Sequence, residues 1–196
     1  LQALVKEYES LAEQGKVSQP GWCQTKVSYE INLYVDGRIK QIICLKQEKE
    51  IGKKKVLIPK TMKVPQMVTR SSGIAANFLC DNSKYLLGID AEGTSGRIMD
   101  CFLAAKEKHI SVLEGTDGIM AQAVRNFFKN WNPESAQECP ELKEQWEGIT
   151  DGGNLVFGMN EFYAQDDPEI QKKWNASQSA TEEEISGICL VTGNYG

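Results

Sequence analysis

The strictest constraint on this chain is a period-two alternation of apolar and polar residues that runs toward an Asp-Gly pair. The apolar set is Val27, Tyr29, Ile31 and Leu33, and the polar set is Lys26, Ser28, Glu30 and Asn32. Successive side chains of a strand point to opposite faces, so the pattern predicts a strand with one buried face. Asp36-Gly37 is a strong signal for a two-residue turn, and residues 38–45 are predicted to return as the partner strand of a β-hairpin.

Helical periodicity and turn residues divide the rest of the chain. Helices are predicted over residues 1–15, 74–80, 97–113, 118–131 and 142–149 and from Pro168 onward, and further strands over 55–59, 85–90, 154–159 and 161–164. The side chains predicted to face inward from the two long helices are Met99, Phe102, Leu103, Ile110, Leu113, Ile119, Ala123, Phe127 and Trp131. The expected fold class is α+β, a mixed chain with antiparallel β-hairpins and several amphipathic helices.

The length of 196 residues is enough for one main domain with a real core. That domain is predicted over residues 1–176, and residues 177–196 are predicted to be a polar loop and a strand leading into a missing C-terminal part. Residue 1 is Leu, which favours a piece of a longer protein. No apolar run approaches the roughly 20 residues that span a bilayer, so a cytoplasmic location is expected.

The residues that usually carry catalysis form no recognisable set. The six cysteines show no paired zinc or redox spacing, and the single histidine, His109, lies among charges, where a solvated position is expected. No lysine follows the glycines at 88, 93 and 96 as a phosphate-binding loop would require. The expectation is a protein that is not an enzyme and that holds no metal or cofactor.

Charge is distributed unevenly along a chain whose net charge is −5. Residues 38–70 contain ten basic and two acidic residues, a balance of about +8, whereas residues 131–184 carry about −10. Such polarity can form a phosphate-attracting face on an acidic protein, although a merely solvated face remains the alternative. The basic residues predicted to contact phosphates are Lys53, Lys54, Lys55, Lys60, Lys63 and Arg70.

Four blocks of sequence carry a resemblance to a known family. The longest runs from Arg70 through Ser71-Ser72-Gly73 and Asn77 to Asn82, followed by Tyr85-Leu86-Leu87-Gly88-Ile89-Asp90. The other blocks are Leu1-Gln2-Ala3-Leu4-Val5 with Pro20-Gly21-Trp22, then Gly152-Gly153-Asn154-Leu155-Val156-Phe157, then Gly187-Ile188-Cys189-Leu190-Val191-Thr192-Gly193. In this order they resemble the N-terminal portion of the large subunit of the CRISPR type I-C effector complex, Cascade.

The resemblance implies a non-catalytic subunit of an RNA-guided antiviral surveillance complex. Such a subunit recognises the protospacer-adjacent motif (PAM) in target double-stranded DNA and binds the duplex. Its implied partners are the CRISPR RNA complex, other Cascade subunits and a separate helicase-nuclease. The residues predicted to read the motif are Ser71, Ser72, Gly73 and Asn77, beside the amino end of the helix predicted at 74–80.

Two other functions stay open from the residues alone. The acidic segment 134–147 and the tryptophans Trp131, Trp146 and Trp174 are also typical of an assembly module that docks neighbouring subunits without touching DNA. A metal-dependent nuclease built on clustered acids is the third alternative, which no tight Asp, Glu and Lys cluster supports. Binding to duplex, binding only to partner subunits and metal-dependent cleavage would distinguish the three.

Overall fold

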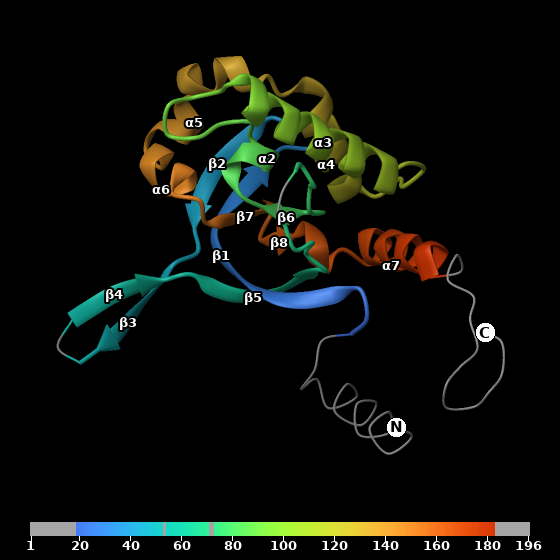
Figure 1. The fold of residues 1–196 in the computed structure, drawn as a ribbon, viewed down its shortest axis with the longest axis horizontal. Helices are drawn as coiled ribbons and strands as arrows, with labels where there is room; N and C mark the ends of the chain where they lie inside the picture. Colours follow the sequence, from blue (N-terminus) through green and yellow to red (C-terminus); the bar gives the residue numbers. More distant parts are fainter. Residues whose placement is uncertain (1–18, 53, 71–72, 183–196) are drawn as a thin grey trace.

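The computed structural model describes residues 19–52, 54–70 and 73–182. A mixed β-sheet is covered by helices, and a two-stranded arm stands out from it (Figure 1). The strands are β1 (Trp22–Leu33), β2 (Ile39–Cys44), β3 (Gln47–Ile51), β4 (Lys54–Ile58), β5 (Lys60–Pro65), β6 (Cys80–Asp81), β7 (Asn154–Met159) and β8 (Phe162–Tyr163). The helices are α2 (Ser83–Leu86), α3 (Gly96–Val112), α4 (Ile119–Asn130), η1 (Pro133–Glu138), α5 (Pro140–Lys143), α6 (Trp146–Thr150), η2 (Ala164–Asp166) and α7 (Pro168–Glu182).

Strand β1 is the centre of the sheet. The order is β2-β1-β7-β6, with β5 also paired to β1 and β8 paired to β7. Residues 29–33 of β1 pair with β2, and residues 22–27 pair with β5, both antiparallel. Strand β7 pairs with β1 in parallel, so the sheet is mixed, whereas the sequence indicated antiparallel strands alone. The predicted α+β class, with helices and antiparallel hairpins, is confirmed.

The arm, β3 and β4, is inserted between the two strands that pair with successive halves of β1. β2 ends at Cys44, β5 begins at Lys60, and the antiparallel arm occupies the chain between them. Leu45 donates its backbone N–H to Ser28 of β1 just before the chain leaves for the arm. Because β2 and β5 both pair with β1, strand β1 determines where the chain leaves the body for the arm and where it returns.

The alternation along β1 is interrupted at Ser28. Tyr29, Ile31 and Leu33 lie in the main core, but Val27 packs in a second cluster with Met62, Val64, Cys80 and Val156. The pairing of β1 with β7 is irregular between Val27 and Tyr29, and such an irregularity moves the following side chains to the other face. The prediction that Val27 shares a face with the later three residues is therefore wrong.

Three of the four residues predicted for the polar face of β1 are also buried, and Lys26 alone of this set is exposed. Ser28, Glu30 and Asn32 are each at most 5 % exposed. Asn32 donates an amide hydrogen to Glu30 at 2.6 Å, and burial raises the pKa of the Glu30 carboxyl. A Cβ on Gly158 of the neighbouring strand would clash with the Glu30 carboxylate, so glycine leaves the space this acid occupies.

The hairpin between β1 and β2 is confirmed, but its turn has three residues. Tyr34 donates to the carbonyl of Arg38 at 2.9 Å, which leaves Val35, Asp36 and Gly37 in the turn. A two-residue turn of the predicted kind needs a positive φ at both central residues, and here only Gly37 has one, at 86°. A Cβ on Gly37 would clash with the α4 backbone at Phe127, so this glycine lets the turn lie directly against the helix.

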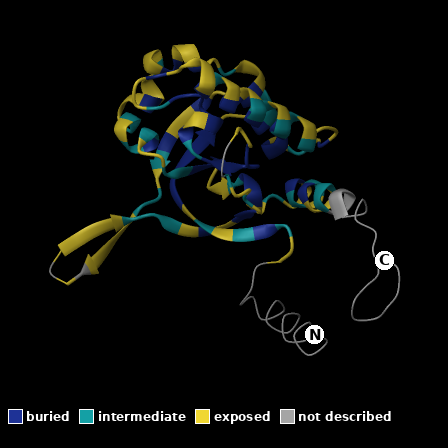
Figure 2. Ribbon diagram, in the orientation of Figure 1, coloured by how far each residue is buried: buried dark blue, intermediate teal, exposed yellow. Residues whose placement is uncertain are grey.

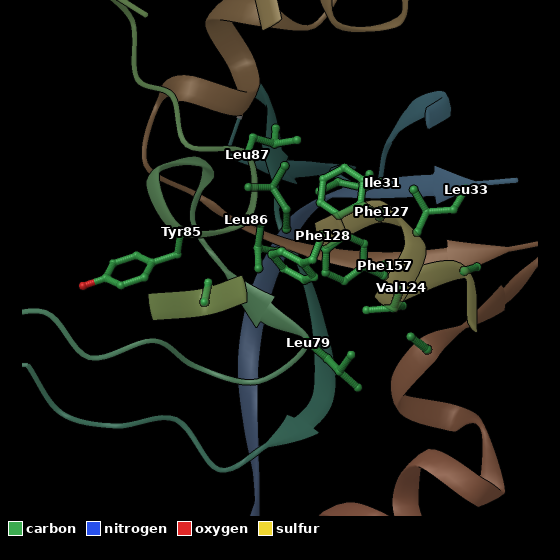
Figure 3. Packing of buried hydrophobic residues seen from close by; sticks show 14 of the residues in the cluster. Ile31, Leu33, Leu79, Tyr85, Leu86, Leu87, Val124, Phe127, Phe128 and Phe157 are labelled. Carbon is green, nitrogen blue, oxygen red and sulfur yellow. The ribbon is translucent and has the colours of Figure 1, made fainter. Parts of the chain in front are cut away.

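The core lies between the sheet and the helices. Figure 3 shows Phe127, Phe128 and Val124 of α4 packed against Ile31 and Phe157 of the central strands. Helices α3, α4 and α7 confirm the predicted positions, and Pro133 begins η1 after the end of α4. The predicted helix at 142–149 is two short helices, α5 and α6.

Two of the inward-facing predictions for the long helices are wrong. Leu103 is 50 % exposed and Ile119 is 59 % exposed, whereas Phe102, Leu113, Ala123 and Phe127 are buried as predicted. Helix α3 also buries Ile98, Cys101, Ala105 and His109, which were not predicted to face inward. The core stripe of α3 is set by the sheet and α4, which local periodicity does not reveal. The predicted strand at 85–90 is also wrong, because residues 83–86 form the single-turn helix α2, capped by the Asn82 side chain.

The ends of the chain differ from the predictions or lie outside the described residues. Helix α7 continues through Glu182, where a polar loop was predicted from Ser177. The predicted helix at 1–15 and the strand-like run near residue 190 fall outside the described residues. The division into a domain at 1–176 and a tail at 177–196 stays a prediction.

His109 is completely buried, so the prediction of a solvated histidine is wrong. Its ring contacts Phe78, Phe128 and Phe157, at centroid distances of 4.4 to 6.0 Å. Nδ1 lies 2.6 Å from the Ala105 carbonyl and Nε2 accepts the Leu79 N–H at 2.9 Å, which assigns the proton to Nδ1. The side chain thus joins α3 to the chain before β6. Burial lowers the pKa of His109 to about 3, although the Ala105 hydrogen bond opposes the shift.

We expect His109 to make stability depend on pH. The pKa is near 6.5 in an unfolded chain and lower in the fold, so its contribution is fully present above about pH 6.5 and is lost as pH falls toward 3. His109→Gln should lower the free energy of unfolding at pH 7 by about 1–3 kcal/mol, because Leu79 loses a well-placed acceptor. The difference between wild type and variant, measured by urea titration, should narrow between pH 7 and pH 4. A difference that stays constant over this range would contradict this role of His109.

Candidate nucleic-acid interface

The arm carries exposed lysines on both of its strands. It projects away from the body, and its two strands are exposed along almost their whole length (Figure 2). Lys54 and Lys55 lie on β4 with their side chains in solvent, and Lys53 lies outside the described residues. Long cationic side chains on such a ribbon can reach a phosphate without being desolvated in the fold.

Lys60 and Lys63 lie on β5, at the base of the arm. The Lys60 ammonium is 5.0 Å from the ring centroid of Tyr163 and donates to its hydroxyl at 3.3 Å. The Lys63 ammonium is 4.9 Å from the Trp22 ring and donates to Gln19 at 3.0 Å. Neither lysine forms an ion pair within the described part of the chain, although both charges act on the Asp166 carboxyl, where burial raises the pKa and the two lysines oppose that shift.

Strand pairing brings residues to Lys63 that the sequence did not single out. Gln24 is directly opposite Lys63 and Lys26 is opposite Thr61 in the β1–β5 pair, and all four are exposed. Directly opposed residues share a face of a sheet, so Lys26 and Lys63 belong to one polar surface next to the arm. The sequence alone does not show that these residues share a surface, because this depends on the register between β1 and β5, whose paired residues lie about 40 positions apart.

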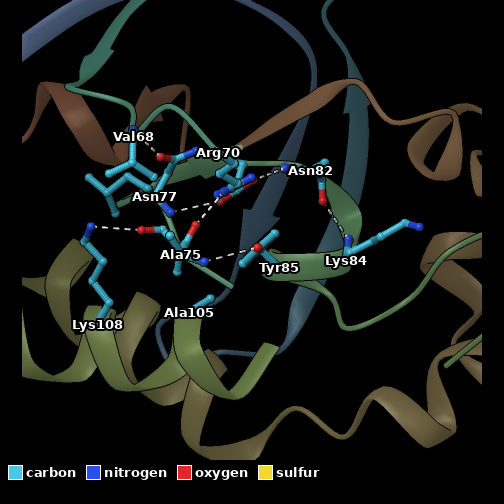
Figure 4. A network of polar contacts seen from close by, with 12 residues as sticks. Val68, Arg70, Ala75, Asn77, Asn82, Lys84, Tyr85, Ala105 and Lys108 are labelled. Atoms are coloured by element: carbon cyan, nitrogen blue, oxygen red, sulfur yellow. Dashed lines mark hydrogen bonds and ion pairs between the residues drawn. The ribbon is translucent and has the colours of Figure 1, made fainter. Parts of the chain in front are cut away.

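Arg70 is engaged by a buried acid. Asp81 is 1 % exposed and forms a two-point ion pair with the Arg70 guanidinium, with Nη1 to Oδ1 at 3.0 Å (Figure 4). The guanidinium carbon lies 3.9 Å from the Tyr85 ring centroid, and Nε donates to the Ala75 carbonyl at 2.5 Å. Because a buried carboxylate is costly without a partner, Arg70 has a structural function that competes with contact to phosphate.

Asn77 is also part of the interior. It is 1 % exposed, and its side-chain oxygen accepts the Val68 N–H at 2.8 Å. Its own N–H donates to the Asp81 carboxylate at 2.9 Å. In this position the Asn77 side chain cannot reach a base edge, so the structure gives no support to its predicted role as a motif reader.

The helix predicted at 74–80 is wrong. Residues 74–79 are irregular and lead into β6, with Leu79 at a φ of 59°. The Asp81 carboxylate accepts hydrogen bonds from the backbone N–H groups of Asn77 and Asn82. Lys108 of α3 donates to the Ala76 carbonyl at 2.9 Å. These longer-range bonds replace the helical ones, and the free helix amides expected after Gly73 are therefore not present.

Of the remaining motif candidates, the structure describes Gly73 alone. Gly73 is exposed with a φ of 86°, and a Cβ there would meet nothing within 4 Å. Ser71 and Ser72 lie outside the described residues. A turn with open space around its backbone can approach a ligand closely, so Gly73 fits the predicted contact better than Asn77 does.

The three tryptophans that were considered for subunit docking form hydrogen bonds within this chain. Trp174 is buried and donates to the Gly21 carbonyl at 2.6 Å, and Trp131 donates to the Leu87 carbonyl at 2.8 Å. Trp146 packs against the main core, with its ring nitrogen 3.4 Å from the Ala91 carbonyl. Their internal contacts weaken the case for a tryptophan docking surface.

Neither a metal centre nor a membrane span is found in the described residues. Over these ranges, no group of three His, Cys, Asp or Glu side chains is placed to hold a metal ion. None of the helices in the described part of the chain is long and apolar enough to cross a bilayer.

The chain matches a known protein family. The family model described as CRISPR-associated protein (Cas_Csd1) matches residues 4–196. The match includes the arm, the polar surface on β1 and β5, and the segment that Asp81 holds. No curated protein matches the chain.

Asn77→Ala tests the structural role of this residue. We expect the free energy of unfolding to fall by about 1–3 kcal/mol, because the buried Val68 N–H loses its acceptor. Thr69→Ala, at an exposed position of the same segment, is the matched control and should change stability by less than about 0.5 kcal/mol. Denaturant titration measures both, and equal, small effects would show that the Asn77 bond contributes nothing.

Proposed function

We propose that this chain, which belongs to the Cas_Csd1 family of CRISPR-associated proteins, the large subunits of type I-C Cascade, binds target double-stranded DNA and recognises its PAM. Family membership is what the resemblance predicted, and it implies other Cascade subunits as partners. DNA binding, motif recognition and the further partners, the CRISPR RNA complex and a helicase-nuclease, are parts of the proposal.

The exposed basic arm is the observation that carries the proposal. Within the described residues Lys49 and Lys54 have no acidic partner within ion-pair distance, and Lys26 and Lys63 lie on the polar surface where the arm joins the body. Phosphate neutralisation releases counterions from the duplex, and this term supplies most non-specific affinity. A net negative protein can therefore bind DNA through one local surface.

We assign motif recognition to the segment around the exposed Gly73 rather than to the buried Asn77. In this proposal Ser71, Ser72 and Gly73 approach the base edges while the lysines hold the backbone. The guide RNA supplies sequence pairing in such a complex, so a few contacts to a short motif are enough. Arg70, which precedes these residues in the chain, is held in place by the buried Asp81.

We further propose that the chain binds without cleaving. His109, the only histidine in the sequence, is buried in the core and accepts the Leu79 N–H, so it does not face a bound duplex. Cleavage would then belong to the separate helicase-nuclease. Purified complex incubated with magnesium or manganese should leave a bound duplex intact.

Replacing residues 47–58 with a short Gly-Ser turn tests the proposed function in the assembled complex. Affinity for duplexes with and without the motif should fall by at least about tenfold. The slope of log affinity against log salt should shrink by about 0.9 for each phosphate that the arm no longer neutralises. Fluorescence anisotropy over a salt series measures both quantities.

Two other outcomes contradict the proposal in different ways. Unchanged affinity and slope in a complex that assembles normally would remove the arm from the DNA interface. Failure of the variant to join the complex, with a normal melting temperature, would support the assembly module instead.

A further inference from the structure

The two strands of the arm have a defined register, which separates its residues into two faces. Lys49 is paired with Val56, and Gln47 with Ile58. Glu48 is paired with Leu57, and Glu50 with Lys55. Opposed residues share a face and successive residues alternate, so Lys54 and Lys55 point to opposite sides of the ribbon.

One face is basic and apolar. It carries Lys49 and Lys54 together with Val56, Ile58 and Gln47, and no acid lies on it among the described residues. Val56 is 40 % exposed, so the alkyl stems of the two lysines and this side chain present a continuous surface to solvent. We call this the lysine face.

The other face carries the acids. Glu48, Glu50 and Lys55 share it with Leu57, and the Lys55 ammonium lies 3.3 Å from the Glu48 carboxylate. Both of these side chains are about two-thirds exposed, so the pair adds little stability, but it agrees with their placement on the same side. With two acids and one base among the described residues, this acidic face repels a phosphate backbone.

We propose that the arm contacts duplex DNA with its lysine face only, while the acidic face turns away from the phosphates. This inference rests on the proposed function and adds the orientation of the arm. The charges are complementary to DNA on one face alone, and a two-stranded ribbon is of a size that the major groove admits. Of the adjacent residues Lys54 and Lys55, only Lys54 then contributes to binding.

Matched charge-removing variants in the assembled complex test the orientation. Lys49→Gln with Lys54→Gln removes both cations of the lysine face and keeps polar side chains on the exposed strands. The slope of log affinity against log salt should fall by about 1.8, which is two phosphate contacts. Lys55→Gln, the neighbouring control, should leave the slope unchanged, and Glu48→Gln with Glu50→Gln should strengthen binding slightly at low salt.

The possible results separate this inference from the proposed function. If Lys55→Gln lowers the slope of log affinity against log salt by about half as much as the double variant does, each lysine contributes equally. That result would refute the one-sided arm, while the proposal that the chain binds DNA would stand. Wild-type complex that binds no duplex would refute the proposed function itself. If the double variant binds duplex normally but no longer enters the complex, the lysine face contacts an acidic protein surface, and the inference is wrong.

Discussion

The triple pairing of β1 is the constraint on which the rest of the structure depends. One 12-residue strand meets β2 and β5 along successive halves and β7 in parallel. It therefore presents side chains to both hydrophobic clusters, and its residues 27–33 are all buried. The arm leaves the body at this point because β2 ends and β5 begins where the pairing passes from one half of β1 to the other.

The buried Asp81 carboxylate links this scaffold to the surface. An isolated carboxylate in the interior would cost several kcal/mol, and the Arg70 guanidinium with two backbone N–H groups offsets that cost. The same contacts fix the irregular segment before β6 and leave the Gly73 turn at the surface. Most of the described residues between Arg70 and Asn82, the longest block behind the family resemblance, thus have structural roles. The exposed Gly73 remains available for recognition.

The sequence predicted local features well and long-range ones poorly. The hairpin at Asp36-Gly37 and the positions of α3, α4 and α7 follow from alternation, helical periodicity and turn residues. The helix predicted at 74–80 was wrong because Asp81 draws Arg70 and Asn77 into bonds that local propensity does not contain. Burial of His109 among three phenylalanines was missed for the same reason, since its neighbours come from distant segments. The basic run was visible in the sequence, but the division of its lysines between two faces depends on the strand register.

Lysine footprinting of the assembled complex tests the central claim, a one-sided basic arm on DNA, most directly. An amine-acetylating reagent is applied with and without target duplex, and mass spectrometry reports the modification of each lysine. A one-sided arm predicts that duplex protects Lys49 and Lys54 strongly while Lys55, on the acidic face, keeps its reactivity. Equal protection of Lys54 and Lys55, or none at either, would contradict it.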